Sequence, residues 1–145
     1  MRLGVVVIPR RLSETDRAEL ADWIAFYKNS RALLHGGSTW LGEGADGLVW
    51  QAAGSPEEFL LFAIQTAPQQ NRRPQPLRLP FLNDAARCTI ALLRIAGGQR
   101  GHAAHRPALY DTPHDWSGSW LAGAGLPLPP LKAESVAIFH GKVAA

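Results

Sequence analysis

The residues of this chain with the most obvious chemical potential are five side chains in one stretch, His102, His105, Asp111, His114 and Asp115. Such groups are potential zinc ligands, but a His-x-x-His pair without a neighbouring cysteine lacks the helical register of a zinc protease. The surrounding segment, Ala96 to Ser119, is rich in Gly, Ala, His and Pro and has no clean period, which is typical of a long loop. We interpret these histidines as solvated loop residues and expect neither a metal site nor a cofactor.

Acid–base and nucleophilic catalysis are not indicated by the other reactive groups. Glycoside cleavage usually needs two carboxylates about 5 to 10 Å apart on rigid elements. The acidic residues lie mainly at an expected helix start or in turns, namely Glu14, Asp16, Glu19, Asp22, Asp46, Glu57, Asp84 and Asp111. A Gly-x-Ser-x-Gly motif is absent, and the single cysteine, Cys88, lies in the apolar run CTIALLRI, where it is expected to be a small core residue. We predict no catalytic residue in this chain.

Gly42, Gly44 and Gly47 reproduce the G-x-G-x-x-G spacing of a dinucleotide-binding fingerprint. That fingerprint requires a helix immediately afterwards, with its N-terminus facing the pyrophosphate. A Trp- and Val-containing strand pattern follows instead, and Asp46-Gly47 is typical of a hairpin turn. We therefore predict a turn here.

Five tryptophans offer a different chemistry, since exposed indoles can stack on the faces of sugars. Trp23 falls on a helical stripe, and Trp40 and Trp50 fall on expected strands, where packing explains them. Trp116 and Trp120 flank the short segment SGS and are the candidate carbohydrate contacts. Core or interdomain packing is the alternative for both.

The composition is that of one globular domain of 145 residues, with 46% hydrophobic and 19% charged residues. The net charge of +3 comes from scattered basic residues, so we expect no nucleic-acid partner. The apolar runs are too short to span a bilayer, so we expect no membrane partner. The opening MRLGVVVIPRRL lacks the apolar core of a signal peptide, which favours a cytoplasmic location.

The first elements are predicted to be a buried strand over Val5 to Ile8 and a helix from about Glu14 to Leu34. Ser13 and Asp16 form a capping-box pattern at the helix start, and Gly36 and Gly37 follow its end. Apolar residues at helical spacing then form one stripe, which consists of Leu20, Trp23, Ile24 and Tyr27 and continues to Leu34. This stripe must pack against another surface.

From Ser38 onward the pattern changes to short apolar runs punctuated by Gly, Pro, Asn and Asp, which predicts an antiparallel β-sandwich. Phe59 to Ile64 is apolar on both faces and should be central, whereas Pro80 should place its segment at an edge or a bulge. The predicted strands are Thr39 to Leu41, Leu48 to Ala52, Phe59 to Thr66, Leu77 to Phe81, Thr89 to Ile95 and Val136 to Val143.

Several segments of the chain carry a family resemblance. They are SGSWLAGAGLPLPPLKAESVAIFHGK from Ser117, WIAFYKNSRALLHGG from Trp23, STWLGEG, EEFLLFAIQTAP with its central Gln65, and PLRLPFLN. Together they resemble the closing part of bacterial α-galactosidases of glycoside hydrolase family 36. The resemblance implies that residues 1–37 correspond to the last strand and helix of a catalytic (β/α)8 barrel, and that residues 38–145 form a C-terminal antiparallel β-sandwich domain.

The same resemblance implies where the chemistry lies. The family's two catalytic aspartates lie on barrel strands that this chain does not contain, and Val6 and Ile8 are apolar where the family generally carries acidic residues. A barrel needs about 250 residues, so only one of its eight units could be present. We therefore expect no catalytic activity from the chain in isolation.

The functional expectation is an accessory domain that braces a catalytic barrel, in cis or in trans, through the helix stripe. If the stripe is left without a barrel, we expect it to form homo-oligomers or to pack on the chain's own sandwich. Two rivals remain. One is a stand-alone carbohydrate-binding module that uses Trp116, Trp120 and the histidine-containing loop, and the other is a small hydrolase, which would turn over an aryl α-galactoside.

Overall fold

The computed structural model describes residues 11–71, 73–97 and 107–144. The strand predicted over Val5 to Ile8 lies outside these residues, as do His102 and His105. The chain divides into two compact units, Met1–Ala32 and Leu33–Ala145. The described part of the first unit is mainly helical, and the second unit is built around one β-sheet.

The long helix α1 spans Glu14–His35, within one residue of the predicted range. Its start is fixed by the predicted capping box. The backbone N–H of Asp16 donates to Ser13 Oγ over 3.1 Å, and the N–H of Ser13 donates to the Asp16 carboxylate over 3.3 Å. These reciprocal bonds satisfy N–H groups that have no partner within the helix, so the chain begins its helix where the sequence predicts.

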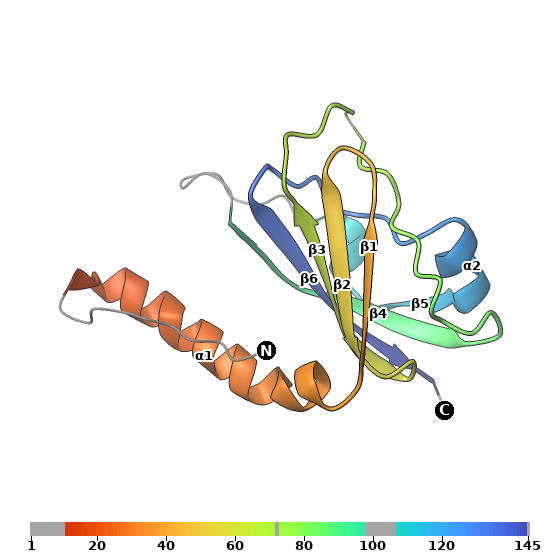
Figure 1. Cartoon of the computed structure of the whole chain (residues 1–145), viewed down its shortest axis with the longest axis horizontal. Coiled ribbons are helices and arrows are strands. Elements are labelled where there is room, and N and C mark those ends of the chain that lie inside the picture. Colours follow the sequence, from red (N-terminus) through yellow and green to blue (C-terminus); the bar gives the residue numbers. More distant parts are fainter. Residues whose placement is uncertain (1–10, 72, 98–106, 145) are drawn as a thin grey trace. The chain divides into compact units, whose positions relative to one another are not determined.

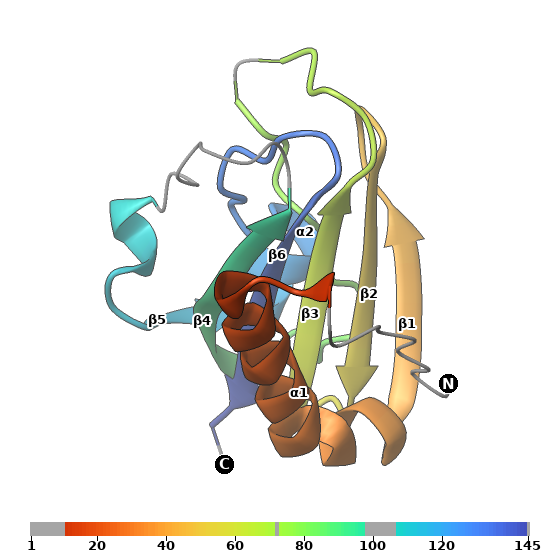
Figure 2. The same ribbon diagram turned by 90° about the vertical axis from the view of Figure 1, so that its left-hand side faces the viewer.

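Six strands form a single antiparallel sheet in the order β1-β2-β3-β6-β4-β5 (Figure 1). Their bounds are β1 Ser38–Glu43, β2 Leu48–Gly54, β3 Glu58–Gln65, β4 Arg87–Gly97, β5 His114–Ser117 and β6 Ser135–Val143. Figure 2 shows the strands side by side from β1 at one edge to β5 at the other. The prediction of a mainly β, antiparallel domain with one long helix is confirmed.

The central strand β3 is apolar on both faces of the sheet from Phe59 to Ile64, as the continuous apolar run predicted. We call the face that carries Trp50, Leu61 and Phe139 the inner face and the opposite one the outer face. Alternation along each strand sends the inner residues into one core. Its members from the strands are Leu48, Trp50, Ala52, Phe59, Leu61, Ala63, Cys88, Ile90, Leu92, Ala137 and Phe139.

A second layer of irregular chain and short helices covers the inner face. It includes α2 (Gly118–Gly123) and η2 (Ala108–Tyr110), and it contributes the buried Leu77, Leu79, Leu82, Tyr110, Leu121, Leu126, Leu128 and Leu131. Its two halves are joined by backbone bonds, with Leu77 and Leu126 each donating to the other's carbonyl over 2.8 and 2.7 Å. The layer gives the domain the two-layered arrangement expected of a sandwich.

The structure corrects two local predictions. Leu77 to Phe81 is not a strand, and the segment makes only one isolated bridge, between Leu77 and Leu126. Pro80 has no N–H to donate, and the neighbouring N–H of Leu79 bonds to Leu121 O over 2.9 Å, so no ladder forms. The predicted loop up to Ser119, in contrast, contains β5 and the beginning of α2.

No helix in the part of the chain that the structure describes combines the length and the hydropathy that a bilayer-spanning segment needs.

Candidate functional site

The helix stripe is the first candidate site. Leu20, Trp23, Ile24 and Tyr27 recur every three or four residues along α1, so they lie on one face of it. The rings of Trp23 and Phe26 meet edge to face, with centroids 5.9 Å apart, and Ile24 is 42% exposed. The described part of the helical unit, residues 11–32, contains no strand and no second α-helix that could cover this stripe.

The two candidate sugar-stacking residues lie in different surroundings. Trp116 is on β5, opposite Cys88 in the ladder, and its partly buried ring packs against the core. Trp120 is on α2 and is 53% exposed. Ser117 caps this short helix by accepting the N–H of Trp120 over 3.2 Å. Trp120 is therefore the indole with a large free surface.

The histidine-containing stretch is described only from Pro107 onward. His114 and Asp115 are exposed on β5, and the Asp115 carboxylate accepts the Thr89 hydroxyl over 2.5 Å. Among the described residues no three His, Cys, Asp or Glu side chains gather as metal ligands would. The described side chains thus supply no observation that points to a metal.

The glycine motif forms the predicted hairpin turn. Gly42 is on β1, and the chain turns through Asp46 and Gly47, whose φ angles are 55° and 76°. The N–H of Leu48 donates to Ala45 O over 3.1 Å, and strand β2 follows rather than a helix.

A hydrogen-bonded network beside this turn was not predicted from the sequence. Gln65, at the end of β3, is fully buried, and its Nε2 donates to the carbonyl oxygens of Asp46 and Ala67 over 2.5 and 2.8 Å. Its Oε1 accepts from Gln69 Nε2 over 3.2 Å, and Asn71 Nδ2 donates to the Asp46 carboxylate over 3.2 Å. The amides thus fasten the β1–β2 turn to the chain that leaves β3.

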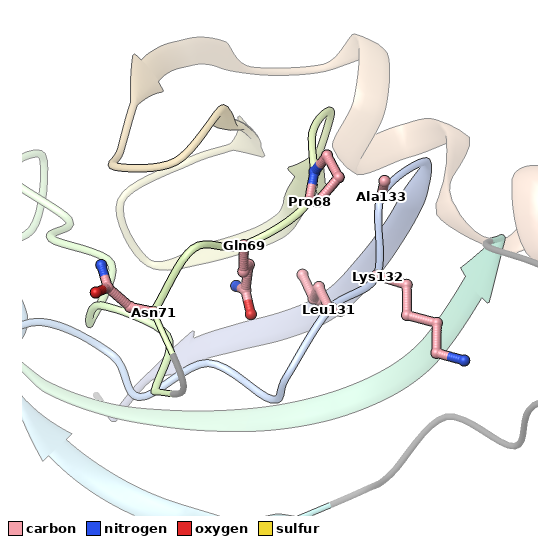
Figure 3. A pocket seen from close by; sticks show the side chains of 6 residues that line it. All are labelled: Pro68, Gln69, Asn71, Leu131, Lys132 and Ala133. Atoms are coloured by element: carbon pink, nitrogen blue, oxygen red, sulfur yellow. The ribbon is translucent and has the colours of Figure 1, made fainter.

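A surface hollow of about 390 Å³ lies next to this network and is lined by Pro68, Gln69, Asn71, Leu131, Lys132 and Ala133. Figure 3 shows Gln69 near its middle, with Lys132 extending away from it. The amide nitrogens of Gln69 and Asn71 already donate within the network. The amides at this hollow thus take part in the turn network, and the Lys132 side chain does not converge with them (Figure 3).

A second hollow, of about 350 Å³, lies at the β1 side of the sheet and is lined by Leu41, Gly42, Glu43, Val49, Trp50, Gln51 and Ile64. Glu43 is its single acidic residue, and the first hollow has none. A retaining or inverting glycosidase needs two carboxylates facing one cleft. Neither hollow provides that pair.

The remaining reactive groups in the core have structural surroundings. Burial raises the pKa of the Cys88 thiol to about 11, so at neutral pH it is protonated and not nucleophilic. Burial also raises the pKa of Tyr110, whose hydroxyl donates to the Pro127 carbonyl. Both residues belong to the buried core.

A half-exposed hydrogen-bonded pair lies on the outer face of the sheet. His140 Nε2 and Glu58 Oε1 are 2.9 Å apart and join β6 to β3. The two side chains are 31% and 42% exposed, so solvent screens them and the pair contributes little to stability. Its geometry is that of a surface cross-strand contact.

Comparisons with known proteins show which proteins have a similar sequence or fold. No family model matches the sequence. An α-galactosidase from Escherichia coli is 34% identical over 117 residues, which cover 75% of this chain and 16% of the relative. Thus the chain spans only a small part of the curated relative's length.

Solved structures of α-galactosidases match a larger share of this chain. The α-galactosidase from Lactobacillus brevis has a TM-score of 0.71 at 14% identity, over 96% of this chain and 18% of its own. The galactosidase domain of the α-galactosidase-sucrose kinase AgaSK has a TM-score of 0.69 at 19% identity, and the match covers 94% of this chain and 17% of that one. The family 36 α-galactosidase AgaB from Geobacillus stearothermophilus has a TM-score of 0.66 at 18% identity, and the match covers 93% of this chain and 17% of that one.

The structural matches establish the shared fold, and the curated relative adds sequence identity. The chain therefore matches the C-terminal domain of glycoside hydrolase family 36 α-galactosidases, as the resemblance in its sequence predicted.

Proposed function

We propose that this chain is a C-terminal accessory domain of an α-galactosidase-like glycoside hydrolase, which braces the catalytic barrel and is not catalytic alone. The parent activity would be hydrolysis of terminal α-galactosides. The observation that carries the proposal is that 93–96% of this chain aligns with only 17–18% of α-galactosidases. Almost the whole chain thus corresponds to a small part of a much larger enzyme.

The helix stripe supports the mode of bracing. Leu20, Trp23, Ile24 and Tyr27 present large apolar side chains on one face of α1. Burying each such side chain contributes roughly 1.5 to 3 kcal/mol. A barrel surface that covers the stripe would gain this free energy, and the barrel would in turn be held by a rigid sheet domain.

The coverage also supports the second half of the proposal, because most of the length of each matched α-galactosidase has no counterpart in this chain. We therefore expect the purified chain to show no turnover of an aryl α-galactoside above background. Turnover by the chain would identify it as a small hydrolase instead.

The test uses a family 36 α-galactosidase from which the segment matching this chain has been removed. Adding the chain in trans should raise the melting temperature of the truncated enzyme and restore part of its activity toward an aryl α-galactoside. The double substitution Trp23→Ser and Ile24→Ser should abolish both effects. The matched control, Ala25→Ser and Asn29→Ser, changes exposed positions on the other side of the helix and should retain them.

One observation favours a second candidate function. Trp120 exposes 53% of its surface on α2, and an exposed indole can stack on a sugar. If the chain is a carbohydrate-binding module, a galactoside titration should give a saturable change in tryptophan fluorescence. Replacing Trp116 or Trp120 with Ala should then remove that change, whereas the bracing function predicts no saturable change at all.

A further inference from the structure

The two edges of the sheet differ in how well they are protected against pairing with another strand. Edge strands of soluble proteins are usually short, charged, bulged or interrupted by proline. The β5 edge follows this rule, because it has four residues, carries Asp115 and comes directly after Pro113. The β1 edge is less protected. It has six residues, Ser38–Glu43, with no proline and an unbroken register with β2, and its one charged residue, Glu43, lies at the end of the strand.

Backbone groups of β1 point away from the sheet at every second residue. The N–H of Gly44 donates to Leu48 O over 2.8 Å, so Gly44 directs its polar groups toward β2. Because this direction alternates along an antiparallel ladder, Thr39, Leu41 and Glu43 direct theirs outward. In the described part of the chain β1 pairs with β2 alone, so these three residues have no ladder partner there.

An apolar side chain lies at the centre of this open edge. Leu41 is 73% exposed. It lines the hollow of about 350 Å³ together with Val49 and Ile64, which belong to the next two strands. Adding a strand beside β1 would cover Leu41 and extend this apolar strip.

We propose that a second copy of this chain is the strand that pairs with β1, antiparallel and with Leu41 opposite Leu41 of the second copy. This register pairs all three outward-facing residues, because Thr39 then lies opposite Glu43 on both sides of the two-fold axis. Each pair can exchange two N–H···O bonds. Shifting the register by two residues leaves one outward residue of each copy without a partner.

The side chains favour the same register. Leu41 meets Leu41, which buries apolar surface, and Thr39 places its hydroxyl beside the Glu43 carboxylate. Glu43 is never opposite Glu43, so like charges do not meet. A self-complementary patch of this kind closes on a two-fold axis, which is the reason for choosing a second copy over an unrelated partner.

The expected dimer is weak. A single pair of six-residue strands buries less than the roughly 1,200 Å² that stable protein interfaces reach. We therefore expect association that depends on protein concentration. This interface is independent of the helix stripe and of the proposed bracing function.

Cysteine cross-linking of the full chain tests the register. In the proposed dimer the two Cα atoms of residue 41 lie about 5.5 Å apart, within the reach of a disulfide. Those of residue 39 lie on the order of 13 Å apart along the strands, beyond it. Leu41→Cys should form a disulfide-linked dimer at least about tenfold faster than Thr39→Cys under the same oxidation. Cys88 is fully buried and gives the common background.

Sedimentation velocity over a range of concentrations tests the backbone pairing. Leu41→Pro removes an outward N–H while sparing the β1–β2 ladder, so it should weaken the dimer at least about tenfold relative to Leu41→Ala. The stripe variant Trp23→Ser and Ile24→Ser should dimerise like the unchanged chain. Equal cross-linking of the two cysteine variants would overturn the proposal, as would a dimer that survives Leu41→Pro or a chain that remains monomeric at every concentration.

Discussion

Gln65 is a fully buried polar side chain, and its amide both donates and accepts hydrogen bonds, which few other side chains can do. Its nitrogen donates to the carbonyls of Asp46 and Ala67, and its oxygen accepts from Gln69. A buried polar group costs about 1 to 3 kcal/mol when its hydrogen bonds are lost. A side chain at this position must therefore both donate and accept.

Replacing Gln65 with Glu should destabilise the protein by about 3 kcal/mol or more at neutral pH, because a carboxylate would face the carbonyl oxygens of Asp46 and Ala67. The same repulsion should raise the pKa of the new carboxyl in the folded state above its value in the unfolded chain. A group with a raised folded pKa is least harmful below its unfolded pKa. The deficit should therefore be smallest below the ordinary pKa of glutamate and grow as the pH rises through the folded value.

Urea denaturation of Gln65→Glu and of the unchanged protein between pH 4 and pH 8 measures this difference. Gln65→Met is the control, because it removes the same hydrogen bonds without adding a charge. Its deficit should be smaller and should not vary with pH. A Gln65→Glu deficit that stays constant over this range would contradict the account.

At the scale of elements, a glycine and an aromatic ring set the packing between β3 and β6. Phe59 and Gly141 are opposite each other in the ladder, and Phe59 is fully buried. A Cβ on Gly141 would lie 2.2 Å from the Phe59 ring, so the ring occupies the space that a side chain would need. The absence of a side chain at residue 141 is therefore part of the core.

We expect Gly141→Ala to lower the free energy of unfolding by about 1 to 3 kcal/mol, because it overpacks this contact. Gly123→Ala is the matched control. Gly123 ends α2, and a Cβ there would meet nothing within 4 Å, so the change should be neutral or stabilise by up to about 1 kcal/mol. Chemical denaturation of both variants makes the comparison, and equal unfolding free energies would contradict it.

Elements with their own local signals could be predicted from the sequence. Helix α1 has a capping box at Ser13 and a long apolar period, and its observed bounds agree with the prediction. Strands β2, β3 and β6 have apolar runs between turn residues, and they form near the expected positions. In these segments local preference and tertiary packing point to the same structure.

Elements whose structure depends on distant partners could not be predicted. Strand β5 is only HDWS, and it is a strand because it pairs with Arg87 to Ile90 of β4. Helix α2 has six residues, too few to show a helical period. For the same reason the different surroundings of Trp116 and Trp120 were not visible in the sequence, since the β5 register brings Trp116 against the core.

For the whole molecule, the division into the units Met1–Ala32 and Leu33–Ala145 has a consequence for stability. Most of the stability of a helix in a protein comes from the packing of its apolar face rather than from helix propensity. We therefore expect local opening of α1 to cost less free energy than opening the central strands of the sheet when no barrel covers the stripe. A barrel that binds only the folded helix should stabilise it by mass action.

Hydrogen exchange of the full chain, with and without the truncated α-galactosidase, measures that stabilisation segment by segment. At a partner concentration about 100 times the Kd, amides of α1 should exchange about 100-fold more slowly than in the chain alone. The slowly exchanging amides of β3 and β6 report the stability of the core in both samples. The variant Trp23→Ser and Ile24→Ser should show no slowing in α1, because it lacks the apolar surface that the barrel covers. If the partner slows exchange in the sheet but leaves α1 unchanged, the barrel binds through another surface and the stripe is not the brace.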